Sequence, residues 1–247
     1  MSKGIGLSGE LKAKVTRFFG CLLTTLIATF SAQGQGFVNL DFEAAKVIPV
    51  STNLDGSVNV ATTDALPGWV AFHGTNQLSL IPFNYDPTGS HGVPPVGLYG
   101  GTNVIVPQGK FVVRVGFGSS ISQTGFVPTA AESLLFDVVG TSLAPCSVFL
   151  NGQNLPYLAV SNAIISEFGH DYPYVVFGAD ISAFAGQTVT LTFSGTPETG
   201  NPGTLDDIQF SSSPVPEPGG LSLLALGSGA LVCLRLRRRA GKTQSRR

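Results

Sequence analysis

The sequence predicts a single all-β domain, a β-sandwich, between two hydrophobic ends that do not belong to it. Three observations predict this class. The 247 residues suffice for one large β domain, the 31 glycines and 16 prolines argue against a helical bundle, and short apolar runs recur between turn residues. Units of βαβ type would need helical segments between the strands, and none is evident. We expect the sandwich to occupy residues 35–213, since no linker interrupts the chain before the serines at 211–213.

The charge of the chain is segregated along its length. Of the 14 Lys and Arg residues, 4 precede residue 18 and 7 follow residue 234, so that only Lys46, Lys110 and Arg114 lie between. The stretch 35–213 therefore carries 3 basic against 13 acidic side chains, a net charge of −10. Phosphate contacts require clustered basic side chains. The composition thus disfavours a nucleic-acid-binding module.

The first 34 residues have the three parts of a signal peptide. Residues 1–17 are basic, residues 18–30 form a run of 13 apolar or uncharged residues, and residues 32–34 offer small side chains for cleavage near Gly34. Such a run is short for a membrane span and typical of a segment exported through the Sec translocon. The alternative, a buried helix of the domain, lacks an amphipathic pattern. Cys21 precedes most of the apolar run, which disfavours a lipoprotein signal.

The candidate strands of the domain are short apolar or alternating segments bounded by Gly, Pro, Asn or Asp. They are residues 37–43, 69–72, 77–81, 96–99, 103–106, 111–117, 134–139, 147–150, 157–160, 174–177, 188–194 and 204–210. The pair Asn151-Gly152 predicts a tight hairpin. Val189, Leu191 and Phe193 alternate with threonines, so their strand should bury one face.

Cys146 is the only cysteine in the stretch 35–213, because Cys21 and Cys233 lie in the two hydrophobic segments. We therefore expect no disulfide within the domain. An exported domain without disulfides depends on its core or on a metal for stability.

The C-terminal 34 residues contain three consecutive signals. The motif Pro216-Glu217-Pro218 is followed by 16 uncharged residues at 219–234, which would span about 24 Å as a transmembrane helix. A basic tail then begins, with arginines at Arg235, Arg237, Arg238 and Arg239. These arginines should stop transfer and keep the terminus in the cytoplasm. The two prolines hold the chain around Glu217 extended, a form that an enzyme cleft accepts at low ordering cost.

This arrangement closely resembles the PEP-CTERM sorting signal of Gram-negative bacteria, over about residues 215–247. The resemblance implies that an exosortase, an integral-membrane cysteine transpeptidase, recognises the Pro-Glu-Pro motif and removes the helix and the tail. It also implies passage from a single-pass inner-membrane form to the cell surface or extracellular matrix. The alternative is a permanent single-pass anchor behind a proline-rich linker.

The middle of the chain resembles the jelly-roll domains of the carbohydrate-binding-module and galactose-binding-like group. The resemblance rests on residues 39–43 (NLDFE), 66–69 (LPGW) and 204–210 (TLDDIQF). It implies a jelly-roll-like sandwich whose first and last strands lie close together, often beside a structural calcium ion.

Four acidic residues near these landmarks are candidate calcium ligands. Asp206 shares strand parity with Ile208 and Phe210, so it should be partly buried and need a partner. Calcium takes six to eight oxygen ligands. We therefore expect Glu43 and Asp206 to hold Ca²⁺, with Asp41 and Asp207 as weaker ligands. The alternative is that these acids are solvated or bond to turn amides.

No catalytic motif is present. His73, His91 and His170 are scattered, and the chain has no metalloprotease, nucleophile-elbow or phosphate-binding pattern. A carboxylate pair for glycoside hydrolysis is a spatial feature that spacing does not reveal. The sequence predicts a protein that is not an enzyme, with a surface hydrolase as one alternative.

A glycan-binding module is the other alternative. Sugar sites use aromatic faces beside polar side chains. Tyr85 and Tyr99 lie near polar loops and are the better candidates, whereas Trp69 is a weaker one because it fits core packing. The leading interpretation is a non-enzymatic surface or extracellular-matrix protein associated with exopolysaccharide. The acidity of its domain favours cation-bridged contacts with the polysaccharide.

Overall fold

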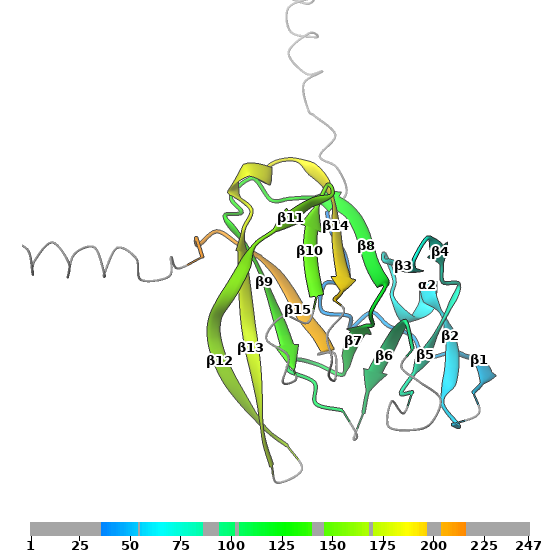
Figure 1. Ribbon diagram of the computed structural model, residues 1–247. Coiled ribbons are helices and arrows are strands. Elements are labelled where there is room, and N and C mark those ends of the chain that lie inside the picture. Colours follow the sequence, from blue (N-terminus) through cyan, green and yellow to red (C-terminus); the bar gives the residue numbers. More distant parts are fainter. Residues whose placement is uncertain are drawn as a thin grey trace, which may run out of the picture. The chain divides into compact units, whose positions relative to one another are not determined.

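A computed structural model describes residues 36–53, 55–85, 94–101, 104–139, 146–167, 170–196 and 204–215. This part of the chain is mostly β-strand, and its two sheets pack in a sandwich-like arrangement (Figure 1). The predicted all-β sandwich is therefore confirmed at this level. Two short helical turns also occur, α2 (Thr62–Ala65) and η1 (Ser182–Phe184).

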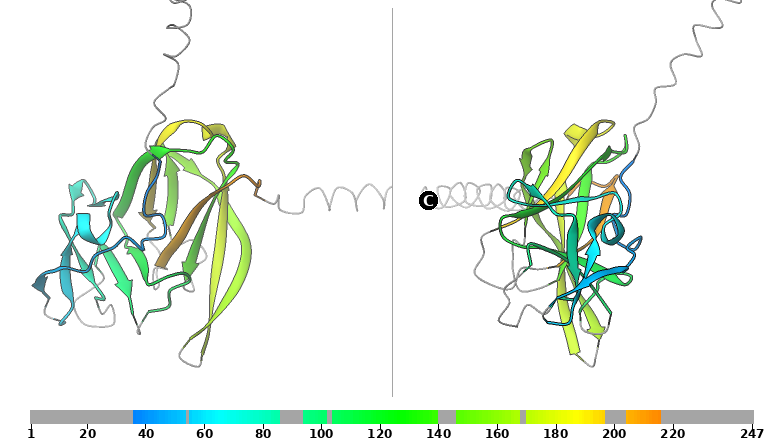
Figure 2. Two further views of the ribbon diagram at one scale, coloured as in Figure 1. Left: turned by 180° about the vertical axis from the view of Figure 1, so that it is seen from behind. Right: turned by 90° about the vertical axis from the view of Figure 1, so that its right-hand side faces the viewer.

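The larger sheet has nine strands. In spatial order they are β1 (Pro49–Thr52), β2 (Val58–Ala61), β5 (Leu80–Phe83), β6 (Val96–Gly100), β7 (Phe111–Val115), β15 (Thr204–Ser211), β9 (Ser133–Val139), β13 (His170–Asp180) and β12 (Tyr157–Glu167). Neighbours are antiparallel except β5 and β6. Figure 2 shows from behind that β12 and β13 form the outermost ribbon of this sheet.

The smaller sheet has six strands. In spatial order they are β11 (Gln153–Leu155), β10 (Cys146–Leu150), β14 (Thr188–Gly195), β8 (Ser119–Phe126), β3 (Val70–His73) and β4 (Asn76–Gln77). The predicted hairpin at Asn151-Gly152 is confirmed. It joins β10 to β11, and both of its turn residues have positive φ, as a two-residue hairpin requires.

An aromatic cluster lies at the centre of the core between the sheets. The ring of Phe136 in β9 lies 5.4 Å from that of Phe193 in β14 and 5.7 Å from that of Phe177 in β13. Trp69 packs between Phe193 and Phe42, at 6.3 and 5.9 Å. All five side chains are buried. Burial of several large aromatic rings supplies much of the apolar area that stabilises such a domain.

The segment 36–48 is not a strand, so the prediction for residues 37–43 is wrong. Asn39 and Phe42 have φ values of 50° and 59°, and this left-handed backbone breaks an extended run. The segment is nevertheless fixed. The N–H of Val38 donates to Gln123 Oε1 at 2.6 Å, Gln123 Nε2 donates to the Val38 carbonyl at 2.9 Å, and Trp69 Nε1 donates to the Asn39 carbonyl at 3.0 Å.

Most of the other predicted strands are present in the structure, and some are not. Seven predicted segments correspond to strands: 69–72, 96–99, 111–117, 134–139, 147–150, 188–194 and 204–210. Two others, 157–160 and 174–177, are parts of strands of 11 residues each. The segment 77–81 is divided between β4 and β5, and residues 104–106 are not a strand. β1, β2, β8 and β11 were not predicted. The sequence of β8 lacks a clear apolar alternation because polar Ser119 and Gln123 occupy buried positions.

Several predictions lie outside the described residues. They concern the signal peptide at 1–34, Pro216, Glu217, Pro218, the helix at 219–234, and Arg235, Arg237, Arg238 and Arg239. Within the part that the structure describes, no helix is long and apolar enough to cross a membrane. Cys146 is buried there as a free thiol whose pKa burial raises to about 12.

Candidate functional site

Two carboxylates face each other across β15 and β9, on the outer face of the nine-stranded sheet. Asp206 pairs with Asp137, and the preceding pair is Leu205 with Val138. Leu205 and Val138 belong to the core, so the alternating side chains of Asp206 and Asp137 point to the other face. Asp206 is fully buried and Asp137 is 7% exposed. We call Asp137 and Asp206 the acidic pair and treat it as the candidate functional site.

A β-bulge directs Asp206 to this face. The register between β15 and β9 shifts between Asp206 and Gln209, and Asp207 has a φ of 44°. Beyond the bulge, Phe210 pairs with the core residue Leu134. The burial predicted for Asp206 is confirmed, but the shared parity with Phe210 is wrong because the extra residue reverses the alternation.

Both predicted principal ligands bond to one loop, residues 107–110, just before β7. Asp206 Oδ2 accepts from Gln108 N at 3.1 Å, and Glu43 Oε1 accepts from Lys110 N at 2.6 Å and from Phe111 N at 2.9 Å. Gly109, with a φ of 75°, lies so close to the Glu43 carboxylate that a side chain there would collide with it. Glu43 and Asp206 thus bond to turn amides, which was the alternative to a calcium site.

Of the two weaker candidate calcium ligands, one lies beside Asp206 and the other bonds within a local turn. Asp207 follows Asp206 and accepts a hydrogen bond from Gln209 Nε2, whereas Asp41 Oδ1 accepts from the Glu43 N–H at 3.2 Å. Asp137 was missed by sequence reasoning. The signal that could have found it is a single acid inside the apolar run Leu134–Val139, at a position where strand alternation does not explain a charge.

Burial makes ionisation of the acidic pair unfavourable. It is the largest cause that raises the pKa of Asp206 to about 8; the N–H groups of Gln108 and Asp207 oppose the rise, and the charges of Asp207 and Asp137 add to it. The pKa of Asp137 rises to about 7, through burial and then the charge of Asp207. Two opposed buried carboxylates need a proton or a cation to neutralise them.

Side chains alone do not provide enough ligands to hold a cation at the acidic pair. Among the described residues, no three His, Cys, Asp or Glu side chains converge closely enough to hold one ion. Asp137 is nevertheless 7% exposed, and both burial and the charge of Asp207 disfavour its ionised form. Backbone carbonyls and water would have to complete the six to eight oxygens of a calcium site there.

Two of the three predicted sugar-stacking residues have no exposed face. Trp69 is 3% exposed within the core, and Tyr99 is 5% exposed beside Arg114, where burial raises the pKa of its hydroxyl. Their prediction as ligand platforms is therefore wrong, because stacking requires an accessible ring. Tyr85 is partly buried and lies at the end of a described range.

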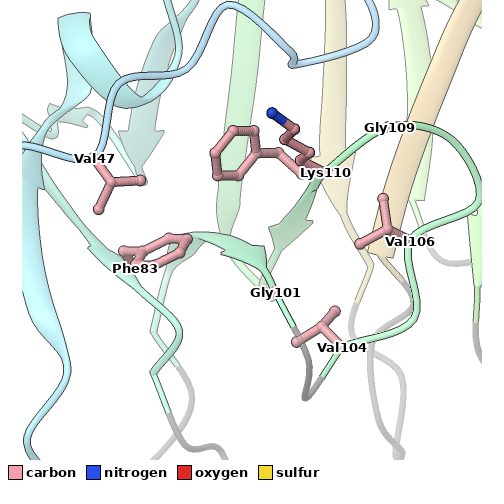
Figure 3. Close-up of a pocket in the computed structure, with 8 residues that line it drawn as sticks. Val47, Phe83, Gly101, Val104, Val106, Gly109 and Lys110 are labelled. Atoms are coloured by element: carbon pink, nitrogen blue, oxygen red, sulfur yellow. The ribbon is translucent and has the colours of Figure 1, made fainter. Parts of the chain in front are cut away.

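A pocket of about 410 Å³ adjoins the loop 107–110 (Figure 3). Its lining is mainly apolar and consists of Val47, Phe83, Gly101, Val104, Val106, Gly109, Lys110 and Phe111. The rings of Phe83 and Phe111 meet nearly edge to face at 6.2 Å. Lys110 contributes the one cationic side chain of this lining, in a domain with few cations. The pocket is an accessible surface with aromatic and cationic character, which the sequence did not indicate.

The histidines do not form a described catalytic centre. His73 Nδ1 lies 3.0 Å from Ser119 Oγ, its cross-strand partner, but the described contacts add no carboxylate that would orient the ring for catalysis. His170 begins β13, and His91 lies outside the described residues.

No family model, curated protein or solved structure matches this chain. The site is therefore interpreted from its own geometry.

The acidic pair predicts a stability that falls as pH rises. Folded-state pKa values of about 7 and about 8 lie above the ordinary value of 3.8, so the folded state binds more protons than the unfolded state between these limits. In EDTA, the melting midpoint should fall from pH 5 to pH 9. Asp137→Asn should flatten this fall, and Asp171→Asn, a change of an exposed acid, should not. A midpoint that is constant or rises over this range contradicts the assignment.

Proposed function

We propose that the chain is an exported, non-enzymatic protein of the cell surface or extracellular matrix, delivered by its C-terminal sorting signal. One observation supports the proposal: the described residues complete a buried core before the residues of the sorting motif. Ser133 Oγ donates to the Ser213 carbonyl at 2.8 Å, and Val215 packs beside Gly178, immediately before Pro216-Glu217-Pro218. The buried core identified in the described residues spans residues 42–208. The Pro-Glu-Pro motif that follows this core in the sequence would be recognised by an exosortase-type membrane enzyme.

The jelly-roll-like class is part of this proposal. Its support is the link between the beginning and the end of the domain, since the Ile208 N–H donates to the Leu40 carbonyl at 3.0 Å. Proximity of the first and last segments is what the resemblance to carbohydrate-binding and galactose-binding-like domains implies.

The hydrolase alternative gains little from the acidic pair. Asp137 and Asp206 do lie opposite each other, as a carboxylate pair would. Glycoside hydrolysis requires both groups to flank an accessible scissile bond. Asp206 is fully buried and bonded to Gln108, so a polysaccharide has no access to it.

Glycan binding is favoured by the pocket in Figure 3 rather than by the predicted tyrosines. A pyranose ring can lie against the apolar surface of Phe83 and Phe111, while the Lys110 ammonium group attracts a carboxylate. An acidic exopolysaccharide, with uronate groups, is the ligand class that fits this combination. Lys46 and Lys110 are the two exposed cations of the described domain.

We also propose Ca²⁺ as the cation that neutralises the acidic pair at neutral pH. Asp137 and Asp206 would contribute carboxylate oxygens, backbone carbonyls and water would complete the ligand set, and Glu43 would keep its bonds to Lys110 and Phe111. The bound ion would supply positive charge that offsets the burial of the carboxylates, and it would stabilise the junction of β15 with β9.

Sorting predicts loss of the C-terminal segment. In cells with the cognate sorting enzyme, the mature protein should lack residues 221–247, and cells without that enzyme should retain the longer form in the membrane fraction. Mass determination of the C-terminus after fractionation measures both. A Glu217→Ala variant should retain the segment. Recovery of intact 221–247 from the mature surface protein contradicts processing and supports a permanent anchor.

Calcium predicts a reversible change in thermal stability. At pH 8, added CaCl₂ should raise the melting midpoint of the purified protein, and EDTA should return it. Asp137→Asn should lose most of this response because it removes a carboxylate without filling the space. Asp171→Asn is the matched control and should respond like the parent. An unchanged midpoint in the parent protein contradicts calcium binding.

The pocket predicts a specific loss of polysaccharide retention. In affinity electrophoresis through a gel that contains a uronate polysaccharide, Lys110→Ala should migrate faster than the parent because it lacks the pocket cation. Lys46→Ala removes an equal charge from an exposed position outside the pocket lining and should be retained like the parent. Equal retention of both variants and the parent argues against a glycan site in this pocket.

A further inference from the structure

The strand β12 is the long edge of the sandwich. Among the described strands, the edges of the two sheets are β1, β4, β11 and β12, with 4, 2, 3 and 11 residues. An edge strand presents unpaired N–H and C=O groups, and proteins protect such edges by shortness or by Lys and Pro residues. The sequence of β12, YLAVSNAIISE, has no Lys, Arg or Pro. This edge therefore lacks the usual protection over most of its length.

The second half of β12 is regular and has an exposed apolar centre. The bulge in its pairing with β13 lies between Ala159 and Ser161, and residues 161–167 then pair one to one. Ile164, at the middle of this regular segment, is 67% exposed. Asn162 and Ser166, which share its face by alternation, are exposed as well. An exposed β-branched side chain at the centre of an open edge costs solubility unless another strand covers it.

We propose that β12 pairs antiparallel with β12 of a second copy of this chain, with a two-fold axis at Ile164. In this register Ile164 faces Ile164 of the second copy, Ala163 faces Ile165, and Asn162 faces Ser166. The same patch serves both copies, as a closed two-fold interface requires. The two nine-stranded sheets then continue into each other.

The chemistry of the segment favours this occupant. Residues 161–166 carry no ionisable side chain, so the self-repulsion expected of an acidic domain is weakest there. Apolar residues meet apolar residues, and polar residues meet polar residues. The Ser166 hydroxyl donates to Asp171 Oδ1 at 2.6 Å, which leaves its oxygen free to accept from the Asn162 amide of the second copy. The pairing is therefore self-complementary at each position.

Disulfide cross-linking tests both the interface and its register. The full chain with Cys21→Ser and Cys233→Ser provides the background, because Cys146 is buried. Directly opposed residues have Cα atoms about 4.5–5.5 Å apart, within disulfide range. Ile164→Cys should therefore give a dimer band on a non-reducing gel after mild copper-catalysed oxidation. Asn162→Cys alone should not, since two copies of residue 162 would lie about 14 Å apart. The double variant Asn162→Cys/Ser166→Cys should give the band.

A charge at the two-fold axis supplies the control. Adding Ile164→Lys to the double-cysteine variant should abolish the band, because two ammonium groups would oppose each other. Phe117→Lys makes the same charge change at a residue that is 68% exposed outside β12, and it should leave the band. The proposal is overturned if no variant forms a dimer, if Asn162→Cys alone cross-links as strongly as Ile164→Cys, or if Phe117→Lys and Ile164→Lys act alike.

Discussion

The bulge in β15 at Asp207 is the constraint on which the candidate site depends. One extra residue reverses the alternation of the strand, so that Asp206 points away from the core while Phe210, four residues later, points toward it. The same distortion lets the Ile208 N–H bond to the Leu40 carbonyl instead of continuing the ladder. A single local irregularity thus buries a carboxylate opposite Asp137 and joins the last strand to the first described segment.

The loop 107–110 connects Asp206 to Glu43 and to the start of β7 through hydrogen bonds. Two carboxylates from distant parts of the sequence, Glu43 and Asp206, accept hydrogen bonds from its amides. Because Lys110 and Phe111 also line the apolar pocket, the bonds to Glu43 fix one wall of that pocket. The acidic pair and the accessible pocket are therefore two sides of one loop, one side buried and the other open to a ligand.

Sequence patterns predicted the fold where side-chain polarity and burial agree. Val189, Leu191 and Phe193 alternate with threonines, and all three are buried. The pattern failed in β8, where Gln123 is buried because it bonds to the backbone of Val38 rather than because it is apolar. The left-handed Asn39 and Phe42, and the bulge at Asp207, are set by tertiary hydrogen bonds that strand periodicity does not encode. Asp137 was missed for a related reason: the residue that makes it notable lies 69 positions away, and only the pairing of β9 with β15 brings the two together.

The position of Val215, the last described residue, agrees with the β12 interface that we propose. Gly178 in β13 pairs with Leu135, which has the same strand parity as Asp137, so a Cβ at Gly178 would point to the outer face, where it would meet Val215. Residues opposed across an antiparallel pair of strands point to the same face, so two sheets joined through β12 would share one continuous outer face. Val215 of both copies would then lie on that face. Because Val215 immediately precedes Pro216-Glu217-Pro218 in the sequence, each copy would carry the proposed sorting motif next to a residue of the same shared face, and the proposed self-pairing is compatible with the proposed sorting.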